Sequence, residues 1–154
     1  MKNLRIALMV AMSIFLTTAC DKDKDPEEPI VVENGTYKGK MTVSTEGVIS
    51  YEQENTEVKI EMGTDNTMSI EMVNVKFDSR MPITLTTMLI PGVTITTTYV
   101  GCSLSGDDII PIAMGGPFPQ FTITDLTGEV TPQKITFSMM CGTYPLSFEG
   151  TIVE

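Results

Sequence analysis

The chain has no histidine and no tryptophan, and only three cysteines among its 154 residues. Without histidine, no side chain ordinarily titrates near neutral pH, and the commonest metal ligand is missing. The Ser-His and Cys-His nucleophile pairs are excluded for the same reason. Catalysis would have to rest on carboxylates alone, so the composition predicts a protein that is not an enzyme, with no catalytic residues, no cofactor and no metal site.

Basic residues are also scarce. Ten Lys and Arg stand against twenty Asp and Glu, which gives a formal charge of −10. Removal of residues 1–19, which hold two basic residues and no acid, would take the charge to −12. Nucleic acids and anionic bilayers are bound through Lys and Arg that displace counterions. The charge therefore excludes nucleic acid as a partner.

The amino terminus has the three parts of an export signal. Lys2 and Arg5 give a positive start, residues 6–16 form an uncharged apolar run, and Thr17-Thr18-Ala19 supplies small residues before a cut. The apolar run is about half of the roughly 20 residues that a bilayer-spanning helix needs. Its length therefore excludes a transmembrane anchor and predicts a signal peptide over residues 1–19.

Cys20 follows the expected cut directly. The stretch Leu16-Thr17-Thr18-Ala19-Cys20 resembles the bacterial lipoprotein signal, in which cleavage falls just before a cysteine that is then acylated. Thr17 stands where that family usually has leucine. The resemblance implies a lasting attachment to a membrane, since two or more acyl chains hold a protein stably. The alternative is a secreted protein cut after Ala19, in which Cys20 is incidental.

Residues 20–33 are predicted to form a flexible acidic tether. Residues 21–29 are charged, punctuated by proline and empty of large apolar groups, so they cannot bury enough surface to offset their ordering entropy. Acids directly after Cys20 resemble the export tag of surface lipoproteins in one group of Gram-negative gut bacteria. That resemblance implies an outer membrane lipoprotein exposed at the cell surface.

From residue 34 to residue 154 apolar and polar residues alternate with a period of two, which is typical of strands with one buried face. No window of 11 or more residues shows helical spacing. The predicted strands lie at 37–43, 58–62, 68–77, 83–100, 109–112, 120–124, 126–130, 134–140 and 144–153. About 120 residues suffice for one core. We predict an all-β domain, an antiparallel meander barrel of 8–10 short strands.

Residues 83–100 are predicted to form a hairpin around Pro91-Gly92. A three-residue loop or a bulge would place the apolar residues of both arms on one face, since pattern specifies register. The other face would then carry Thr84, Thr86, Thr94, Thr96 and Thr98. Such a row could be a regular binding surface, but threonine also suits an exposed strand face, and we favour that interpretation.

Cys102 and Cys141 remain in the domain. In an exported protein an even pair of cysteines indicates a disulfide, and closing a loop of about 39 residues would stabilise the fold by about 3–4 kcal/mol. Two buried thiols or a reactive pair also fit, because the distance between the cysteines cannot be read from the sequence.

The two ends of the domain resemble the calycin-like β-barrel domains found on lipoproteins of those gut bacteria. The motifs are Gly35-Thr36-Tyr37-Lys38-Gly39-Lys40-Met41-Thr42-Val43 and Leu146-Ser147-Phe148-Glu149-Gly150-Thr151-Ile152. The resemblance covers residues 34–154 and implies a barrel related in shape to lipocalins, with first and last strands paired. Lipocalins place tryptophan where Tyr37 stands, so the resemblance carries the architecture and no ligand chemistry.

Three groups of side chains could form a site. Nine methionines outside the leader could bind Cu(I), but they follow strand parity and are interpreted as core filler. A glycosidase would need two facing carboxylates, and the sequence brings no two together; the candidates are Glu52, Glu54, Asp107, Asp108 and Asp125. The irregular stretch 114–119 is predicted to form a ligand rim with Met114 and Phe118.

The sequence thus predicts a non-enzymatic, lipid-anchored protein of the cell envelope that binds a small apolar or amphipathic ligand in the barrel mouth. One alternative is an accessory subunit of a surface assembly that docks a partner protein through a sheet face or an edge strand. A weaker alternative is a carboxylate-based glycoside hydrolase. A cavity of a few hundred cubic ångströms inside the barrel would favour the ligand, whereas a packed interior would leave no room for one.

Overall fold

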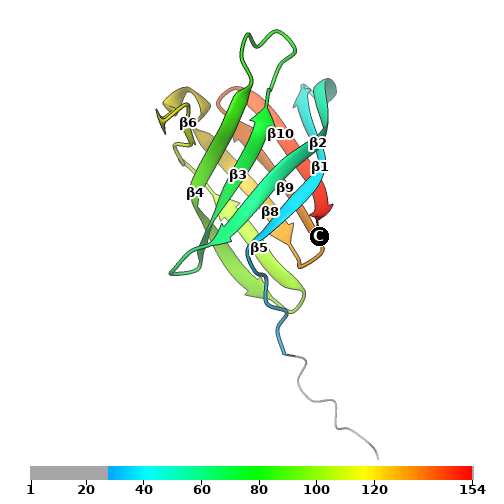
Figure 1. Ribbon diagram of the computed structural model, residues 1–154, viewed down its shortest axis with the longest axis vertical. Helices are drawn as coiled ribbons and strands as arrows, with labels where there is room; N and C mark the ends of the chain where they lie inside the picture. Colours follow the sequence, from blue (N-terminus) through cyan, green and yellow to red (C-terminus); the bar gives the residue numbers. More distant parts are fainter. Residues whose placement is uncertain (1–27, 154) are drawn as a thin grey trace, which may run out of the picture.

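The computed structural model describes residues 28–153, in which strands make up nearly all of the regular structure (Figure 1). The predicted signal peptide, Cys20 and most of the tether lie outside the described residues. The elements are β1 (Gly35–Thr45), β2 (Val48–Met62), β3 (Thr67–Val75), β4 (Leu85–Thr98), β5 (Gly101–Gly106), β6 (Ile112–Ala113), β7 (Gly116–Pro117), the 3-10 turn η1 (Pro119–Phe121), β8 (Ile123–Val130), β9 (Lys134–Cys141) and β10 (Tyr144–Ile152). No helix in the described part of the chain has the length and apolar character of a membrane-crossing segment.

The eight long strands form one closed antiparallel barrel. Each long strand pairs with the next long strand along the chain, from β1 through β5 to β8, β9 and β10, and β10 pairs with β1. The short β6–β7 hairpin lies outside this ring, with β6 paired to β4. The predicted all-β meander barrel is therefore confirmed.

Alternation of residue type decides which side chains enter the barrel. In β1 the side chains of Tyr37, Met41 and Val43 are buried, while Lys38 faces solvent. The same period of two runs through β9 and β10, so the apolar residues of all eight strands meet in one core. Five methionines belong to that core, as the interpretation of methionine as filler expects: Met41, Met68, Met72, Met88 and Met139.

The hairpin predicted at Pro91-Gly92 is wrong, because β4 runs through these residues without turning. Gly92 has a φ of +67°, and the register with β3 shifts beside it. An extra residue with a left-handed glycine is a β-bulge. Pro91 needs no hydrogen-bond partner there, because β4 pairs with β6 before the bulge and with β5 after it. The bulge keeps Ile90 and Val93 both buried.

The two ends of the barrel are built differently. At the lower end in Figure 1, the chain enters beneath the strands and Val32 is buried there. The Tyr37 hydroxyl donates a hydrogen bond of 2.8 Å to the Thr131 carbonyl, which ties β1 to the β8–β9 turn. At the upper end lie the β3–β4 loop, the β1–β2 turn and the β6–β7 hairpin. Here β2 extends beyond its pairing with β3, and the Gln53 amide bridges to the Asn74 carbonyl and the Lys76 N–H.

Closure requires glycine where β1 meets β10. Gly39 lies opposite Gly150, and a Cβ atom on Gly39 would overlap the Glu149 carbonyl group. The backbones can approach this closely only because both residues lack a side chain. The glycines in the two terminal motifs therefore serve the β1–β10 seam.

We expect Gly39→Ala to lower the free energy of unfolding by about 1–3 kcal/mol, the usual cost of forcing extra atoms into a packed site. Urea denaturation followed by circular dichroism measures the change. Gly116→Ala is the matched control, since a Cβ there would meet nothing within 4 Å. Equal stabilities of the two variants would contradict this account of the seam.

Candidate functional site

The interior of the barrel is filled with side chains. A side chain that lined a chamber large enough for water would keep accessible surface inside the barrel. Met41, Ile70 and Met88, from three different strands, have none. Across the barrel, the rings of Phe137 and Phe148 pack with centroids 5.4 Å apart. The packed side chains of the core thus leave no room for the ligand chamber that was predicted in the barrel mouth.

An aromatic cluster closes the upper end, where the mouth was predicted. Phe77 from the β3–β4 loop meets the edge of Phe121 at 5.2 Å between ring centroids, with an interplanar angle of 80°. Phe118 and Tyr144 pack against Phe121 at 5.2 and 6.1 Å. Such pairs contribute about 0.5–1.5 kcal/mol each beyond the area they bury. Three separate segments of the chain are therefore held together over the core.

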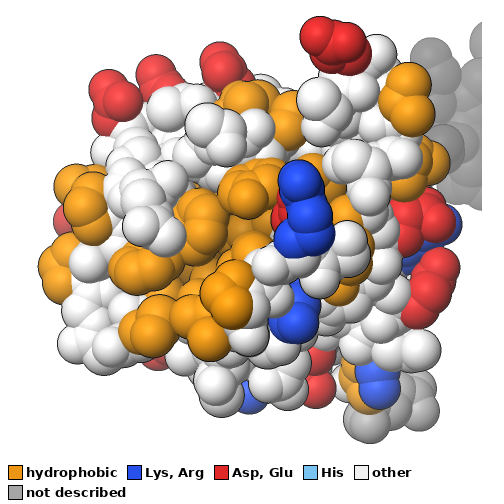
Figure 2. Space-filling view, turned by 90° about the horizontal axis from the view of Figure 1, so that it is seen from above, with side chains coloured by type: hydrophobic (Ala, Val, Ile, Leu, Met, Phe, Trp, Pro, Cys, Tyr) orange, Lys and Arg blue, Asp and Glu red, His pale blue; other side chains and the backbone are white. Residues whose placement is uncertain are grey.

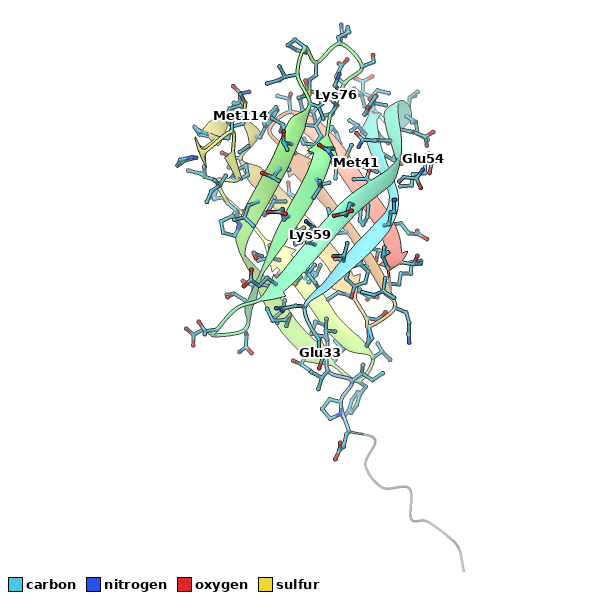
Figure 3. All side chains as sticks on the ribbon, in the orientation of Figure 1. Glu33, Met41, Glu54, Lys59, Lys76 and Met114 are labelled. Carbon is cyan, nitrogen blue, oxygen red and sulfur yellow. The ribbon has the colours of Figure 1, made fainter. Side chains whose placement is uncertain are left out.

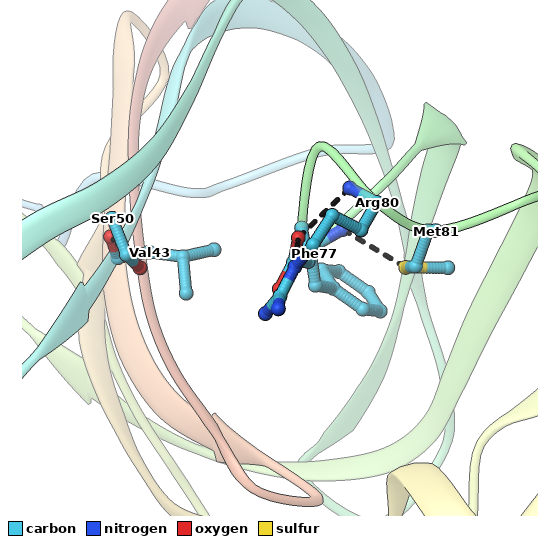
Figure 4. A network of polar contacts seen from close by, with 6 residues as sticks. Val43, Ser50, Phe77, Arg80 and Met81 are labelled. Carbon is cyan, nitrogen blue, oxygen red and sulfur yellow. Dashed lines mark hydrogen bonds and ion pairs between the residues drawn. The ribbon is translucent and has the colours of Figure 1, made fainter.

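The loop that carries Phe77 is held by its own polar contacts (Figure 4). Both carboxylate oxygens of Asp78 accept hydrogen bonds from the Arg80 guanidinium, and Oδ1 also accepts one from the Arg80 N–H. The Phe77 N–H points to the Met81 sulfur at 3.2 Å. Hydrogen bonds from Arg80 lower the pKa of Asp78 to about 2. This folded loop keeps Phe77 directed into the ring of strands.

The two predicted rim residues both lie at this end, but Met114 is exposed and Phe118 is half-buried. Met114 is at the tip of the β6–β7 turn with a φ of +52°, and 67% of it is exposed. Phe118 is instead half-buried in the aromatic cluster, where its N–H bonds to the Pro111 carbonyl at 2.8 Å. The structure therefore exposes Met114 at the tip of a turn and makes Phe118 part of the plug beneath it.

Hydrophobic side chains gather over this closed end. Seen from above, they spread from the centre toward the side that carries β6, with acidic side chains at the periphery (Figure 2). We call this set the upper apolar surface; its exposed members are Ile83, Ile110, Ile112 and Met114. Ile112 is opposite Leu89 of β4 and Pro117 of β7, so β-pairing fixes it in place. Packing and pairing thus hold large apolar groups in water on a rigid support.

A broad hollow lies on the outer wall of the barrel, not inside it. Its volume is about 720 Å³, and it crosses β2, β1, β10, β9 and β8. Its floor includes a row of hydroxyls, each opposite the next in the sheet: Thr42, Ser147, Ser138 and Thr127. The row continues through Ser105, Thr94 and Thr67. The threonines of β4 thus form part of an exposed strand face.

The candidate carboxylates lie on β2, in the turn after β5 and on β8. Glu52 and Glu54 both pair with Lys40, whereas a glycosidase needs two carboxyl groups that face each other across the bond to be cleaved. Asp107 accepts a hydrogen bond from the Asp125 N–H. Asp108 lies in the turn after β5 with a φ of +51°. Within residues 28–153, no three Cys, Asp or Glu side chains converge as a metal site would need.

The structure keeps Cys102 and Cys141 apart as two free, buried thiols. Cys102 lies opposite Val130 and Cys141 opposite Ile123, at the two ends of β8. Seven strand residues span about 20 Å, whereas a disulfide needs Cα atoms within about 7 Å. Of the alternatives that the sequence left open, this fold has the two separate thiols.

With the barrel and its ends described, comparison with known proteins identifies the family. The model of the calycin-like beta-barrel domain matches residues 34–153. The chain belongs to this family. The resemblance drawn from the sequences of β1 and β10 is therefore confirmed, and these two strands form the seam of the calycin-like barrel.

No curated protein gives a significant match to this calycin-like chain. Among solved structures, it is similar to a Bacteroides fragilis protein that is provisionally described as an outer membrane protein. The TM-score is 0.54 with 19% identity, over 79% of this chain and 50% of the other. At that identity the likeness establishes the fold alone, and the chain spans half the length of that protein.

We expect Cys141 to resist alkylation in the folded calycin-like domain. Burial raises the pKa of its thiol to about 12, so almost no reactive thiolate exists at neutral pH. Iodoacetamide followed by peptide mapping should leave Cys141 unmodified in buffer and modify it fully in denaturant. A peptide linking Cys102 to Cys141 before reduction would contradict the structure.

We expect Asp78→Asn to lower the thermal midpoint at neutral pH, because it removes the carboxylate that orders the β3–β4 loop. The folded-state pKa lies below its ordinary value of 3.8, at about 2. This stabilisation is therefore present above pH 4 and is lost as the pH falls through 2. The midpoint difference between wild type and variant should shrink between pH 4 and pH 2. Glu61→Gln, at an exposed site on β2, is the control, and a difference that does not change with pH would contradict the role of Asp78.

Proposed function

We propose that this calycin-like domain is a non-catalytic docking module of the cell envelope. Lipid on Cys20 would hold it on the outer membrane, with the barrel facing outward, and the upper apolar surface would bind a partner protein. The observation that carries the proposal is a large apolar surface held in water at the closed end of a filled barrel. Exposed apolar patches on monomeric proteins mark interaction sites.

The filled core favours a protein partner over a small ligand. A ligand of drug size is buried in a concave pocket of at least about 300 Å³, and side chains occupy that space here. The upper apolar surface instead spreads across several segments, as the central part of a protein interface does. Arg80 stands on the β3–β4 loop at this end with 88% of its side chain exposed, and arginine is enriched at interface hot spots.

The position of the tether supports the same assignment. The described chain begins at the lower end of the barrel, and Met114 lies at the other end (Figure 3). A membrane anchor at Cys20 would therefore leave the upper apolar surface directed away from the bilayer, where a second protein can reach it. The absence of histidine and the pairing of two candidate carboxylates with Lys40 favour a role without catalysis.

The proposal predicts a protein adduct at the upper end in living cells. A photo-crosslinking residue at position 114 should give one discrete adduct with another protein. Ile112→Asp should remove that adduct, because a carboxylate cannot be desolvated at an apolar contact without a partner. The same photo-crosslinking residue in place of Lys59, on the barrel wall, is the control.

Three outcomes are decisive. An adduct that requires position 114 and Ile112 supports docking. Equal adducts at positions 114 and 59, or no adduct at position 114, would contradict the docking proposal. A small molecule retained by the purified protein in native mass spectrometry would instead favour the ligand alternative.

A further inference from the structure

The lower end of the barrel carries a second exposed apolar group, formed by two segments far apart in the sequence. Residues 29–32 run beside Ile95, Thr97 and Cys102, with which they line a hollow of about 250 Å³. Thr97 and Cys102 are paired on either side of the β4–β5 turn. The entering chain and the tip of this hairpin therefore lie next to each other.

Both segments present large apolar side chains to solvent. At the β4–β5 turn, Tyr99 is 82% exposed and Val100 is 63% exposed. On the entering chain, Val31 is 74% exposed, and Ile30 is also exposed. Only Val32 of this segment turns inward and is buried. We call the four exposed residues the lower apolar tip.

The β4–β5 hairpin, which carries Tyr99 and Val100, has no charged side chain. No Asp, Glu, Lys or Arg occurs from residue 81 to residue 106, which covers β4, the turn and β5. The neighbouring β8–β9 turn, Thr131 to Gln133, is also uncharged. A Cβ on Gly101 would overlap the Val130 carbonyl, which shows how closely these two turns approach. Tyr99 and Val100 could therefore leave water without desolvating a charge, whereas Glu28 and Glu33 flank the apolar residues of the entering chain.

The length of chain before the tip limits what can face it. Only eight Cα-to-Cα steps lead from Cys20 to residue 28, where the described chain begins. Even fully extended, they span at most about 29 Å. If Cys20 carries lipid, as the proposed function requires, the surface within reach of the lower end is the bilayer that holds this lipid.

We propose that the lower apolar tip inserts into the interface of the membrane to which the protein is anchored. Tyr99 suits this position, because its ring is apolar and its hydroxyl can remain hydrated. The acidic net charge offers no electrostatic attraction to anionic lipid, so the contact is apolar and requires no anionic headgroup. This insertion rests on the lipid anchor of the proposed function, and it orients the barrel so that the upper apolar surface points outward.

The absence of tryptophan from the chain makes the test specific. Tyr99→Trp and Met114→Trp each introduce a single tryptophan, at exposed turns at opposite ends of the barrel. Each lipidated protein is reconstituted into phosphatidylcholine vesicles, with and without brominated acyl chains. The emission of the Tyr99→Trp variant should shift to shorter wavelength and lose intensity with brominated lipid. The Met114→Trp variant should keep the emission of a tryptophan in water and show no loss.

Two further measurements separate this inference from the anchor itself. Vesicle flotation reports attachment, and the mass of the amino-terminal peptide reports lipid on Cys20. Flotation with equal emission from the two tryptophan variants would overturn the insertion and leave the anchor in place. An unmodified Cys20 and loss of flotation would overturn both. Val100→Ser in the Tyr99→Trp background should weaken the quenching by brominated lipid while flotation persists.

Discussion

Pairing of the first strand with the last is the constraint on which this structure depends. When β10 binds β1, the meander becomes a ring, and backbone groups at the two outer strands find partners within the chain. That seam requires two glycines face to face, Gly39 and Gly150. It also sets the diameter of the ring, because eight strands enclose a space that side chains can fill. The dry core and the two separate ends follow from closure.

A filled ring restricts where recognition can occur. The core uses methionine heavily, and this flexible side chain adapts to gaps that branched residues would leave empty. The wall is a band of hydroxyls and charged pairs, which water already satisfies. Large apolar groups remain exposed at the two ends of the barrel, where loops interrupt the alternation of strands. Function in this domain is therefore best sought at its ends.

Local pattern predicted the strands well because alternation is a direct consequence of having one wet and one dry face. The period predicts a strand with one buried face over residues 37–43, and in the structure Tyr37, Met41 and Val43 lie on that face. Pro91-Gly92 misled because proline and glycine suit both a turn and a bulge. The bulge is favoured over the turn because β3 pairs with β4 both before and after Pro91-Gly92.

The ends of the barrel were harder to predict, because they depend on contacts between distant segments. Phe118 was expected at a rim, but Phe77 and Tyr144, remote in sequence, join Phe121 to form the plug in which it packs. No spacing rule links these residues. Cys102 and Cys141 gave the same difficulty, since only the strand order shows that β8 separates them. Tyr99 lies in a long uncharged stretch that the sequence shows directly, residues 81–106. That stretch indicates a membrane contact only once the fold places the β4–β5 turn at the end of the barrel where the chain enters.

The seam has one more consequence, for how such a barrel is combined with other domains. Tyr37 lies opposite Ile152, so the domain begins and ends on neighbouring strands at the same rim. A short linker could join these two points and the chain could be reopened at the β1–β2 turn, with every pair of strands retained. The strands pair in a closed ring, so the pairing does not depend on which strand comes first along the chain. A larger protein could therefore contain this barrel as an insertion within one of its own loops. The upper apolar surface would remain exposed in such a protein.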